Sequence, residues 1–324
     1  MSTSSTASPG LRIGSRVQGL LRCLSCHSPL RLDGERLQCG NCGTAYPVCD
    51  GIPVLINEAS SVFRVEDFLK RKETFFRKPS RVKTAMRRYV PQLSANVKAQ
   101  ANFRKLKNAL LKQNPNPLVL VIGGSIAGYG MDEFLLSPGL EIVETDVSHG
   151  PRTALICDAH DLPFESGGFD AVIVQAVLEH VVDPACCVAE IHRVLNHRGL
   201  VYAEVPFAQQ VHGRQYDFTR FTHLGLRRLF RKFAEVESGA TCGPGMALAW
   251  AYSYFLLSFA RSGPARAFIT LFARGTAFWC KYFDRFLIDK PGTLDAASAC
   301  YFMGRKSDDE LTDRELLGLY RGAF

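Results

Sequence analysis

Four of the eleven cysteines lie in two closely spaced pairs near the start of the chain. Cys23 and Cys26 form the first pair, and Cys39 and Cys42 follow after twelve residues. Two short turns of this kind can hold four thiolates around one ion, which is the ligand set and spacing of a tetrahedral Zn²⁺ site. Because four thiolates leave no position for water, the sequence predicts a structural zinc. Disulfides and free thiols are the alternatives, and without an evident secretory signal disulfides are not expected.

A second group of chemically competent residues lies in 205–223, VPFAQQVHGRQYDFTRFTH, where charged residues alternate with aromatic ones. Imidazole can take up a proton near neutral pH, so histidine suits a general base. We rank His212 first and His223 second as candidate bases, and His180, which precedes this segment, third. The alternatives are a solvated loop with local ion pairs and, for each histidine, a structural role.

These residues must be positioned by larger elements. Apolar runs predict strands at about 118–122, 140–145, 153–157, 170–175, 199–205 and 299–303. A helical pattern at about 184–195 lies between two of these strands. Such alternation predicts an α/β fold with a parallel, doubly wound sheet, whose ligands bind at the carboxyl ends of the strands.

Three motifs follow the predicted strands in order, namely DVS (146–148), DAHDLPFESGGFD (158–170) and VLEHVVDP (177–184). Over about residues 117–240 the sequence therefore resembles the class I S-adenosylmethionine (SAM)-dependent methyltransferases. The resemblance implies a seven-stranded, Rossmann-like sheet with SAM as the cofactor. The cofactor-binding residues that it implies are Gly123, Gly124, Asp146, Asp158, Ala159 and Gln175. The glycines would let the backbone approach SAM. Asp146 would bind the ribose, and Asp158 would bind the adenine amino group.

One position departs from the family pattern. Family members usually carry an acid near the end of the first strand, where it engages the methionine part of SAM. Here that position is Val121, and the loop that follows it reads GGSIAGYG. Asp132 or Glu133 is a candidate replacement, and a place on the surface of a helix is the alternative for both.

The cysteine pairs are followed by YPVCDGIPVL at residues 46–55. Residues 21–56 as a whole resemble the small zinc-ribbon modules found with methyltransferases. Asp33 and Gly34 lie between the two pairs and predict the turn of a short hairpin.

Charge is distributed unevenly behind a net value of +8. Residues 61–112 carry a net charge of +12, residues 113–212 one of −10, and residues 213–290 one of +7. The acidic central segment suits a cofactor with a positive sulfonium group better than it suits a ligand whose phosphates need a cradle of backbone N–H groups. The basic segment 61–112 is either an RNA-binding linker or a set of helices that cover the sheet.

Residues 243–290 are unusually apolar and read as two helices with interspersed arginines and lysines. A helical segment of this composition can lie in a membrane interface. The alternatives are a lid over the acceptor pocket, an ordinary core element or a dimer face. No uncharged apolar run reaches the length that spans a bilayer.

The predicted organisation has five parts: a disordered tail (1–20), a zinc ribbon (21–58), a basic helical linker (59–116), a SAM-dependent methyltransferase domain (117–306) with an apolar helical insertion (243–290), and a C-terminal helix (307–324). That last helix is expected over 309–320 with Ser307 or Asp308 as its cap.

The predicted function is methyl transfer from SAM to an oxygen or nitrogen of a small-molecule, sugar or lipid-linked acceptor. The first alternative is an rRNA or tRNA base methyltransferase that binds RNA through the ribbon and the basic linker. The second is a non-catalytic scaffold with the same fold. We expect a cytoplasmic protein, either free or held at the membrane surface through 243–290, and the sequence indicates no oligomeric state.

Overall fold

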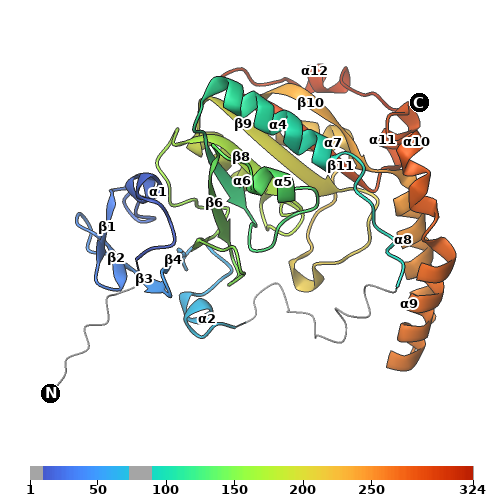
Figure 1. Cartoon of the computed structure of the whole chain (residues 1–324), viewed down its shortest axis with the longest axis horizontal. Coiled ribbons are helices and arrows are strands. Elements are labelled where there is room, and N and C mark those ends of the chain that lie inside the picture. Colours follow the sequence, from blue (N-terminus) through green and yellow to red (C-terminus); the bar gives the residue numbers. More distant parts are fainter. Residues whose placement is uncertain (1–9, 73–89, 324) are drawn as a thin grey trace.

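The computed structural model describes residues 10–72 and 90–323 of the chain. The strands form one sheet in the order β1-β2-β3-β4-β7-β6-β5-β8-β9-β11-β10 (Figure 1). Their bounds are β1 (Leu30–Asp33), β2 (Arg36–Cys39), β3 (Ala45–Cys49), β4 (Ile52–Leu55), β5 (Leu118–Ile122), β6 (Glu141–Asp146), β7 (Leu155–Cys157), β8 (Phe169–Gln175), β9 (Leu195–Pro206), β10 (Phe233–Cys242) and β11 (Ala299–Lys306).

The seven strands from β5 to β11 form the predicted seven-stranded, Rossmann-like α/β sheet, which is thereby confirmed. Strands β7, β6, β5, β8 and β9 run parallel, and β11 lies antiparallel between β9 and β10. The apolar runs located every one of these strands except β10. β10 was not predicted because buried and exposed residues alternate irregularly along it and bulges interrupt its register.

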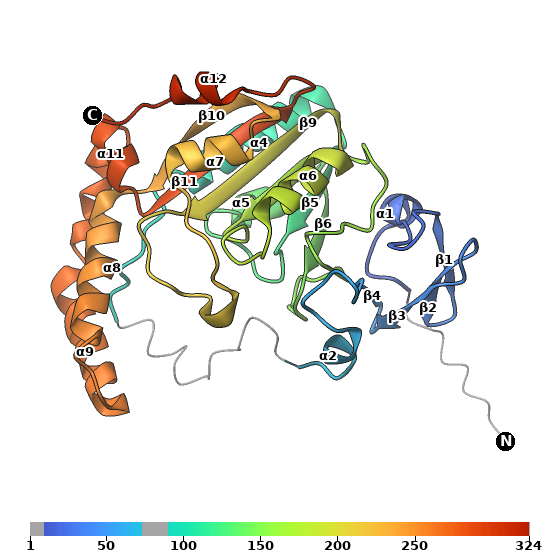
Figure 2. The same ribbon diagram turned by 180° about the vertical axis from the view of Figure 1, so that it is seen from behind.

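Helices cover both faces of this sheet (Figures 1 and 2). All five side chains of β5 are buried, and they alternate between two cores. Val119 and Val121 pack with α4 (Ala99–Gln113) and α5 (Asp132–Leu135). The other face is covered by α1 (Ser15–Leu20), α6 (Pro184–Val194) and α7 (His223–Leu229).

The N-terminal strands continue the central sheet and do not form a detached module. Strands β1 to β4 pair antiparallel with one another, and the turn at Asp33–Gly34 lies where the hairpin was predicted. β4 then pairs parallel with β7, with Val54 opposite Ile156 and Leu55 opposite Cys157. The chain that leaves β4 therefore emerges at the same edge as the chain that leaves β7.

The predicted disordered tail over residues 1–20 is wrong for its last part. Residues 15–20 form helix α1, whose Val17 is 2% exposed, and Leu21 bridges to Phe164. A six-residue helix is too short to show periodicity, so only its packing against the central domain reveals it. Residues 1–9 lie outside the described part.

The basic linker predicted over residues 59–116 contains two described helices, α2 (Val65–Leu69) and α4. Residues 73–89 lie outside the described part. α4 buries Phe103, Leu106 and Leu110 against the sheet. This helix therefore covers the sheet, as one of the two sequence interpretations expected.

The insertion predicted over 243–290 consists of α8 (Pro244–Leu257), α9 (Gly263–Ala277), a short 3-10 turn (η2, Cys280–Tyr282) and α10 (Asp284–Leu287). It lies at the end of the molecule opposite the N-terminal strands (Figure 1). Asp284 is fully buried and accepts the N–H groups of Gly245 (2.7 Å) and Met246 (2.9 Å), which fixes the start of α8. Among the described residues, no helix combines the length and apolarity needed to cross a membrane.

Two short helices complete the chain, α11 (Pro291–Ala296) and α12 (Asp313–Leu317). The last helix is shorter than predicted, and its cap is neither Ser307 nor Asp308. Thr312 and Glu315 form a reciprocal capping box at its start.

Candidate active site and metal centre

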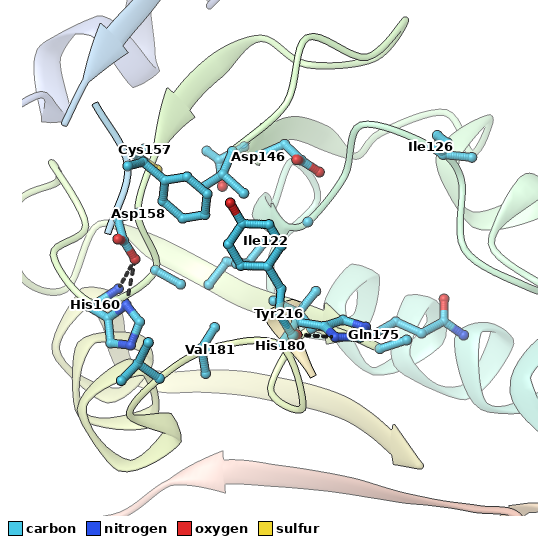
Figure 3. Close-up of a pocket in the computed structure, with 18 of the residues that line it drawn as sticks. Ile122, Ile126, Asp146, Cys157, Asp158, His160, Gln175, His180, Val181 and Tyr216 are labelled. Atoms are coloured by element: carbon cyan, nitrogen blue, oxygen red, sulfur yellow. Dashed lines mark hydrogen bonds and ion pairs between the residues drawn. The ribbon is translucent and has the colours of Figure 1, made fainter. Parts of the chain in front are cut away.

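A pocket opens at the carboxyl ends of β5, β6, β7 and β8, where ligands of parallel sheets bind (Figure 3). It brings together five of the six residues predicted to bind the cofactor. The lining residues used below are Val62, Phe63, Gly123, Gly128, Asp146, Asp158, Ala159, His160, Gln175, His180 and Tyr216.

Glycines are required in the loop after β5. Gly123 has a φ of +74°, and a Cβ atom there would fall 2.3 Å from Cγ2 of Val177. A Cβ atom on Gly128 would fall 1.8 Å from Oε1 of Gln175. Gly124 does not line the pocket, because its Cα faces Glu144, whose Cβ a side chain would meet at 2.8 Å. Gly124 therefore serves packing, whereas Gly123 shapes the pocket.

Asp146 ends β6 and is 5% exposed, with its carboxylate at the pocket. Oδ2 accepts the backbone N–H of Ser125 at 3.0 Å, which orients the side chain against the glycine loop. Burial raises the pKa of Asp146 above its usual value. A buried carboxylate beside this loop is the feature expected of a ribose-binding acid.

Asp158 follows β7 and holds together two parts of the pocket wall. Oδ1 contacts Nδ1 of His160 (2.6 Å), and Oδ2 accepts the hydroxyl of Ser61 (2.5 Å). Burial alone would raise the pKa of Asp158, but the hydrogen bonds from His160 and Ser61 lower it. The same hydrogen bond raises the pKa of His160. Oδ2 retains a lone pair for a further donor such as an adenine amino group.

Gln175 ends β8, lines the pocket and carries a buried acceptor that has no donor among the described residues. Its Nε2 donates to the carbonyl oxygen of Tyr129 at 3.1 Å, whereas Oε1 is buried and accepts no hydrogen bond from the described residues. Val121 is buried and apolar, so no acid stands at that position. Asp132 and Glu133 do not replace it: neither lines the pocket, and Glu133 pairs with Arg104 at the surface.

The pocket has a roof that sequence reasoning missed. Phe63, from the segment after β4, stacks on Tyr216 with ring centroids 5.8 Å apart and planes 25° apart. Val62 lies beside it, and Ser61 binds Asp158. No local pattern marks these residues. The signal was the YPVCDGIPVL strand, whose parallel pairing with β7 delivers the next residues to this edge.

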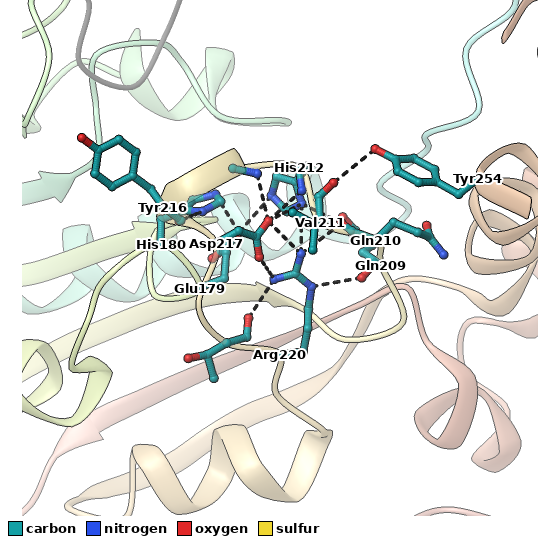
Figure 4. Close-up of polar contacts among 12 residues, drawn as sticks. Glu179, His180, Gln209, Gln210, Val211, His212, Tyr216, Asp217, Arg220 and Tyr254 are labelled. Atoms are coloured by element: carbon teal, nitrogen blue, oxygen red, sulfur yellow. Dashed lines mark hydrogen bonds and ion pairs between the residues drawn. The ribbon is translucent and has the colours of Figure 1, made fainter. Parts of the chain in front are cut away.

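Two of the three candidate bases meet at one side of the pocket, together with Glu179 (Figure 4). The rings of His180 and His212 are 4.9 Å apart in an edge-on arrangement. Nε2 of each lies 3.6 Å from Oε1 of Glu179. Burial lowers the pKa of His180, whereas the contact with Glu179 raises that of His212.

The loop that carries His212 is held by an ion pair between Asp217 and Arg220 (2.5 Å). Asp217 also accepts the backbone N–H groups of His212 (2.7 Å) and Gly213 (2.9 Å). Burial would raise the pKa of Asp217, but these contacts, with Arg220 foremost, hold it well below its usual value. The segment predicted to be functional is thus an ordered loop with local ion pairs that also reaches the pocket.

His223, the second candidate base, lies elsewhere. It begins α7 behind the Thr222 cap, is 6% exposed, and lines a different cavity with Tyr320 and Arg321. Its Nε2 lies 2.8 Å from Oγ of Ser238 and 3.0 Å from Nη2 of Arg321. Helix entry at Thr222 carries His223 away from the pocket, so the structure does not bring this candidate base to the proposed cofactor site.

The four predicted zinc ligands converge at the other end of the sheet. Their Sγ atoms all lie within 4.8 Å of one another. The Sγ atoms of Cys23 and Cys42 are 3.6 Å apart, and those of Cys26 and Cys39 are 3.4 Å apart. A tetrahedral ion with Zn–S bonds of about 2.3 Å places sulfurs about 3.8 Å apart, so the cluster has the size that zinc requires.

The two cysteine turns have the same backbone. His27 and Gly43 each lie four residues after the first cysteine of a pair and have φ values of +56° and +76°. The N–H of His27 donates to the carbonyl oxygen of Cys23 at 2.8 Å, and that of Gly43 to Cys39 at 3.0 Å. Two equivalent turns that face each other are the geometry of a four-thiolate site.

Part of the chain is similar to known proteins. Residues 128–203 match the family model of a methyltransferase domain. No curated protein matches the sequence. Among solved structures, the chain is similar to phosphoethanolamine N-methyltransferase 2 from Haemonchus contortus (17% identity, 63% of this chain, 53% of that chain, TM-score 0.40). It is also similar to 1,6-didemethyltoxoflavin-N1-methyltransferase from Burkholderia thailandensis (16%, 64%, 80%, 0.39). The strand order is that of the Rossmann-like class I methyltransferase fold, and the family match covers residues 128–203 within it.

Proposed function

We propose that the protein is a SAM-dependent methyltransferase that acts on an oxygen or nitrogen of a small-molecule or lipid-linked acceptor. The observation that carries the proposal is the pocket itself, which gathers Gly123, Asp146, Asp158, Ala159 and Gln175 at one edge of the sheet. The buried acids suit the hydroxyls of the ribose and the amino group of the adenine.

Gln175 supports the proposal in place of the missing acid at Val121. Its buried Oε1 accepts no hydrogen bond from the described residues and lies against the glycine loop. The α-ammonium group of SAM is a donor that would satisfy it. A neutral amide in this role binds a zwitterionic methionine group without adding charge beside the buried Glu204.

The sulfonium of SAM already activates the leaving group, so the protein's part is to align acceptor and methyl carbon. His180 lines the SAM pocket, and His212 lines a small cavity with Trp250 and Tyr254 of α8. The acceptor would enter between the two, from the side of α8. This arrangement favours a compact acceptor group over a base in a folded RNA.

The basic segment also favours a small acceptor. In its described part, Lys98, Arg104 and Lys105 pair with Asp289, Glu133 and Glu237 at 2.7–2.8 Å. Protein cations strengthen RNA binding when they neutralise phosphates and displace the counterions condensed on the RNA. Cations that are already paired with carboxylates displace fewer of these counterions, so they add less to RNA affinity. RNA binding remains an outcome of the tests below.

We also propose that Cys23, Cys26, Cys39 and Cys42 bind a structural Zn²⁺. The phenol of Tyr46 accepts the N–H of Leu24 at 2.9 Å and lies 3.4 Å from Sγ of Cys23, so its own proton can point at the sulfur. Donors to the ligand sulfurs are the outer shell that stabilises zinc thiolates.

The exposed face of the α8–α9 region suggests how a lipid-linked acceptor would be reached. Large apolar side chains are exposed along it, namely Leu248, Phe255, Phe259, Phe268, Leu271, Phe272, Trp279, Phe283 and Phe286. Arg261, Arg266 and Arg285 are exposed among them, and Asp284 is buried. Apolar groups with interspersed cations fit the surface of an anionic bilayer. We propose that an anionic membrane surface is the binding partner of the α8–α9 region.

Isothermal titration with SAM tests the enzyme proposal directly. We expect binding to the full chain, at least tenfold weaker binding to Asp146→Ala, and unchanged binding to the surface variant Asp132→Ala. Absence of SAM binding would favour the scaffold alternative. Incubation with methyl-labelled SAM and a cell extract then shows whether label enters the RNA or the small-molecule and lipid fractions.

A further inference from the structure

The polar group beside the pocket contains a buried carboxylate without a hydrogen bond. Glu179 is 0% exposed, and neither of its side-chain oxygens accepts a hydrogen bond from the described residues. The two imidazole Nε2 atoms at 3.6 Å are beyond hydrogen-bonding distance. Buried carboxylates in proteins are paired, hydrogen-bonded or bound to a metal.

The histidines present the correct atoms to this carboxylate. Nδ1 of His180 lies 2.8 Å from the carbonyl oxygen of Tyr216, and Nδ1 of His212 lies 3.3 Å from that of Gln210 and 3.7 Å from Oδ2 of Asp217. A carbonyl oxygen only accepts, so the contact with Tyr216 places a proton on Nδ1 of His180 and an electron pair on its Nε2. For His212 the carbonyl oxygen of Gln210 favours the same tautomer, whereas Nη2 of Arg220, which lies 3.4 Å from Nδ1, only donates and favours the other. Histidines that bind metals are oriented in the way that His180 is.

One ligand atom from each of Glu179, His180 and His212 lies within 4.8 Å of the other two. Three ligands of this kind form one face of a coordination sphere and leave the remaining positions open. His180 lines the pocket and His212 lines the small cavity beside α8, so the three ligands lie between these two spaces.

We propose that Glu179, His180 and His212 bind a divalent cation such as Mn²⁺, Fe²⁺ or Zn²⁺, which holds a hydroxyl oxygen of the acceptor beside SAM. This deepens the proposed function and rests on it. It also assigns the two histidines a different part from the general base predicted from sequence, because a metal ligand has no electron pair left for a proton.

The reaction then balances without a protein base. The cation lowers the pKa of the bound hydroxyl, which releases its proton to water. The oxygen forms a bond to the methyl carbon of SAM while the bond from that carbon to sulfur breaks, and its electron pair stays on sulfur. The products are a methyl ether, S-adenosylhomocysteine and one proton. The acceptor class is thereby narrowed to compounds with a hydroxyl group.

Titration with Mn²⁺, followed by electron paramagnetic resonance, tests the site, because thiolates prefer zinc and leave Mn²⁺ to oxygen and nitrogen ligands. We expect one Mn²⁺ per chain, bound at least tenfold more weakly by Glu179→Gln and by His212→Gln. The exposed His197→Gln is the matched control and should bind as the native protein does. Equal binding by native protein and Glu179→Gln overturns the proposal, and so does absence of Mn²⁺ binding.

A stability measurement separates the metal site from its rival, an ion pair between Glu179 and a protonated His212. A carboxylate that awaits a cation destabilises the metal-free protein, so Glu179→Gln should raise the unfolding midpoint in chelator. An ion pair predicts a fall instead, and a fall overturns the proposal. SAM titration on the same samples keeps the two proposals distinct: SAM binding without Mn²⁺ binding refutes only the metal site, and Mn²⁺ binding without SAM binding refutes only the proposed function.

Discussion

The ring of Phe63 stacks on the ring of Tyr216, with centroids 5.8 Å apart, and both residues line the pocket. The two residues come from opposite parts of the chain, since Phe63 follows β4 and Tyr216 follows β9. The N-terminal strands therefore contribute directly to the candidate SAM site.

A double-mutant cycle measures this contact. Phe63→Ala and Tyr216→Ala should each weaken SAM binding several-fold, because the adenine side of the pocket loses its cover. The two effects should fall short of additivity by about 1 kcal/mol, the usual worth of an aromatic pair beyond its buried area. Calorimetric titration of the native protein, both single variants and the double variant gives the coupling. Additive effects would show that the rings do not act together.

Gln175→Met should weaken SAM binding by roughly ten- to a hundredfold, since it removes a hydrogen bond to a charged group worth about 1.5–3 kcal/mol. The substitution keeps length and volume, so thermal unfolding should change little. Decarboxylated SAM, which retains the amino group and lacks the carboxylate, is the informative probe. If the native protein and the variant bind this analogue equally, Gln175 does not contact the ammonium group.

Removal of the zinc should weaken SAM binding as well as disrupt the fold of the N-terminal strands. Ser61 and Phe63 reach the pocket through β4, so their position depends on the four-cysteine cluster. Cys42→Ser should lose close to one equivalent of zinc in a colorimetric release assay and should bind SAM weakly. Cys186→Ser, an exposed cysteine on α6, is the control. Full SAM affinity in zinc-free Cys42→Ser would contradict this dependence.

The stability of the protein should fall as the pH falls from about 6.5 to 4, in part because of His223. Burial, and then the neighbouring Arg321, lowers the pKa of His223 to about 4. Over this range the unfolded chain, whose histidine has a pKa of about 6.5, binds more protons than the folded one, so acid favours unfolding. The free energy of unfolding, measured with urea, should fall between pH 7 and pH 4.5 in both proteins. This fall should be smaller by roughly 2 kcal/mol for His223→Gln than for the native protein. An unchanged loss would mean that His223 is already protonated in the folded state.

Association with membranes should depend on the exposed apolar residues of the α8–α9 region. Vesicles that contain an anionic lipid should carry the native protein upward in a flotation assay, and neutral vesicles should do so less. Phe259→Ser combined with Phe268→Ser should abolish flotation, since both rings are about 70% exposed. Leu136→Ser, which changes an even more exposed apolar residue elsewhere, should not abolish flotation. If flotation depends neither on lipid charge nor on these substitutions, the α8–α9 region is not the membrane-binding surface.

The sequence predicted those parts of the sites that depend on residues close together in the chain. Asp146 ends β6 and Asp158 directly follows β7, so an apolar run with an acid at its end was enough to place both at the pocket. The four cysteines were found for the same reason, because each pair forms within one turn.

The rest depends on pairings between distant segments. His212 and His223 lie close in sequence, yet Thr222 caps a helix between them and carries His223 away from the pocket. Glu179 was not among the candidate residues, and it becomes one only because the loop after β9 brings His212 beside it. Phe63 could be placed only once β4 was known to pair with β7.

The pairing of β4 with β7 also has a consequence for solubility. β7 is three residues long, fully buried, and would be the edge of the sheet if β4 were absent. An uncovered strand of Leu155, Ile156 and Cys157 presents unpaired backbone groups and apolar side chains, which are a template for association between copies. The N-terminal strands cover this edge, so we expect a chain cut after β4 to associate with other copies more readily than the full chain does.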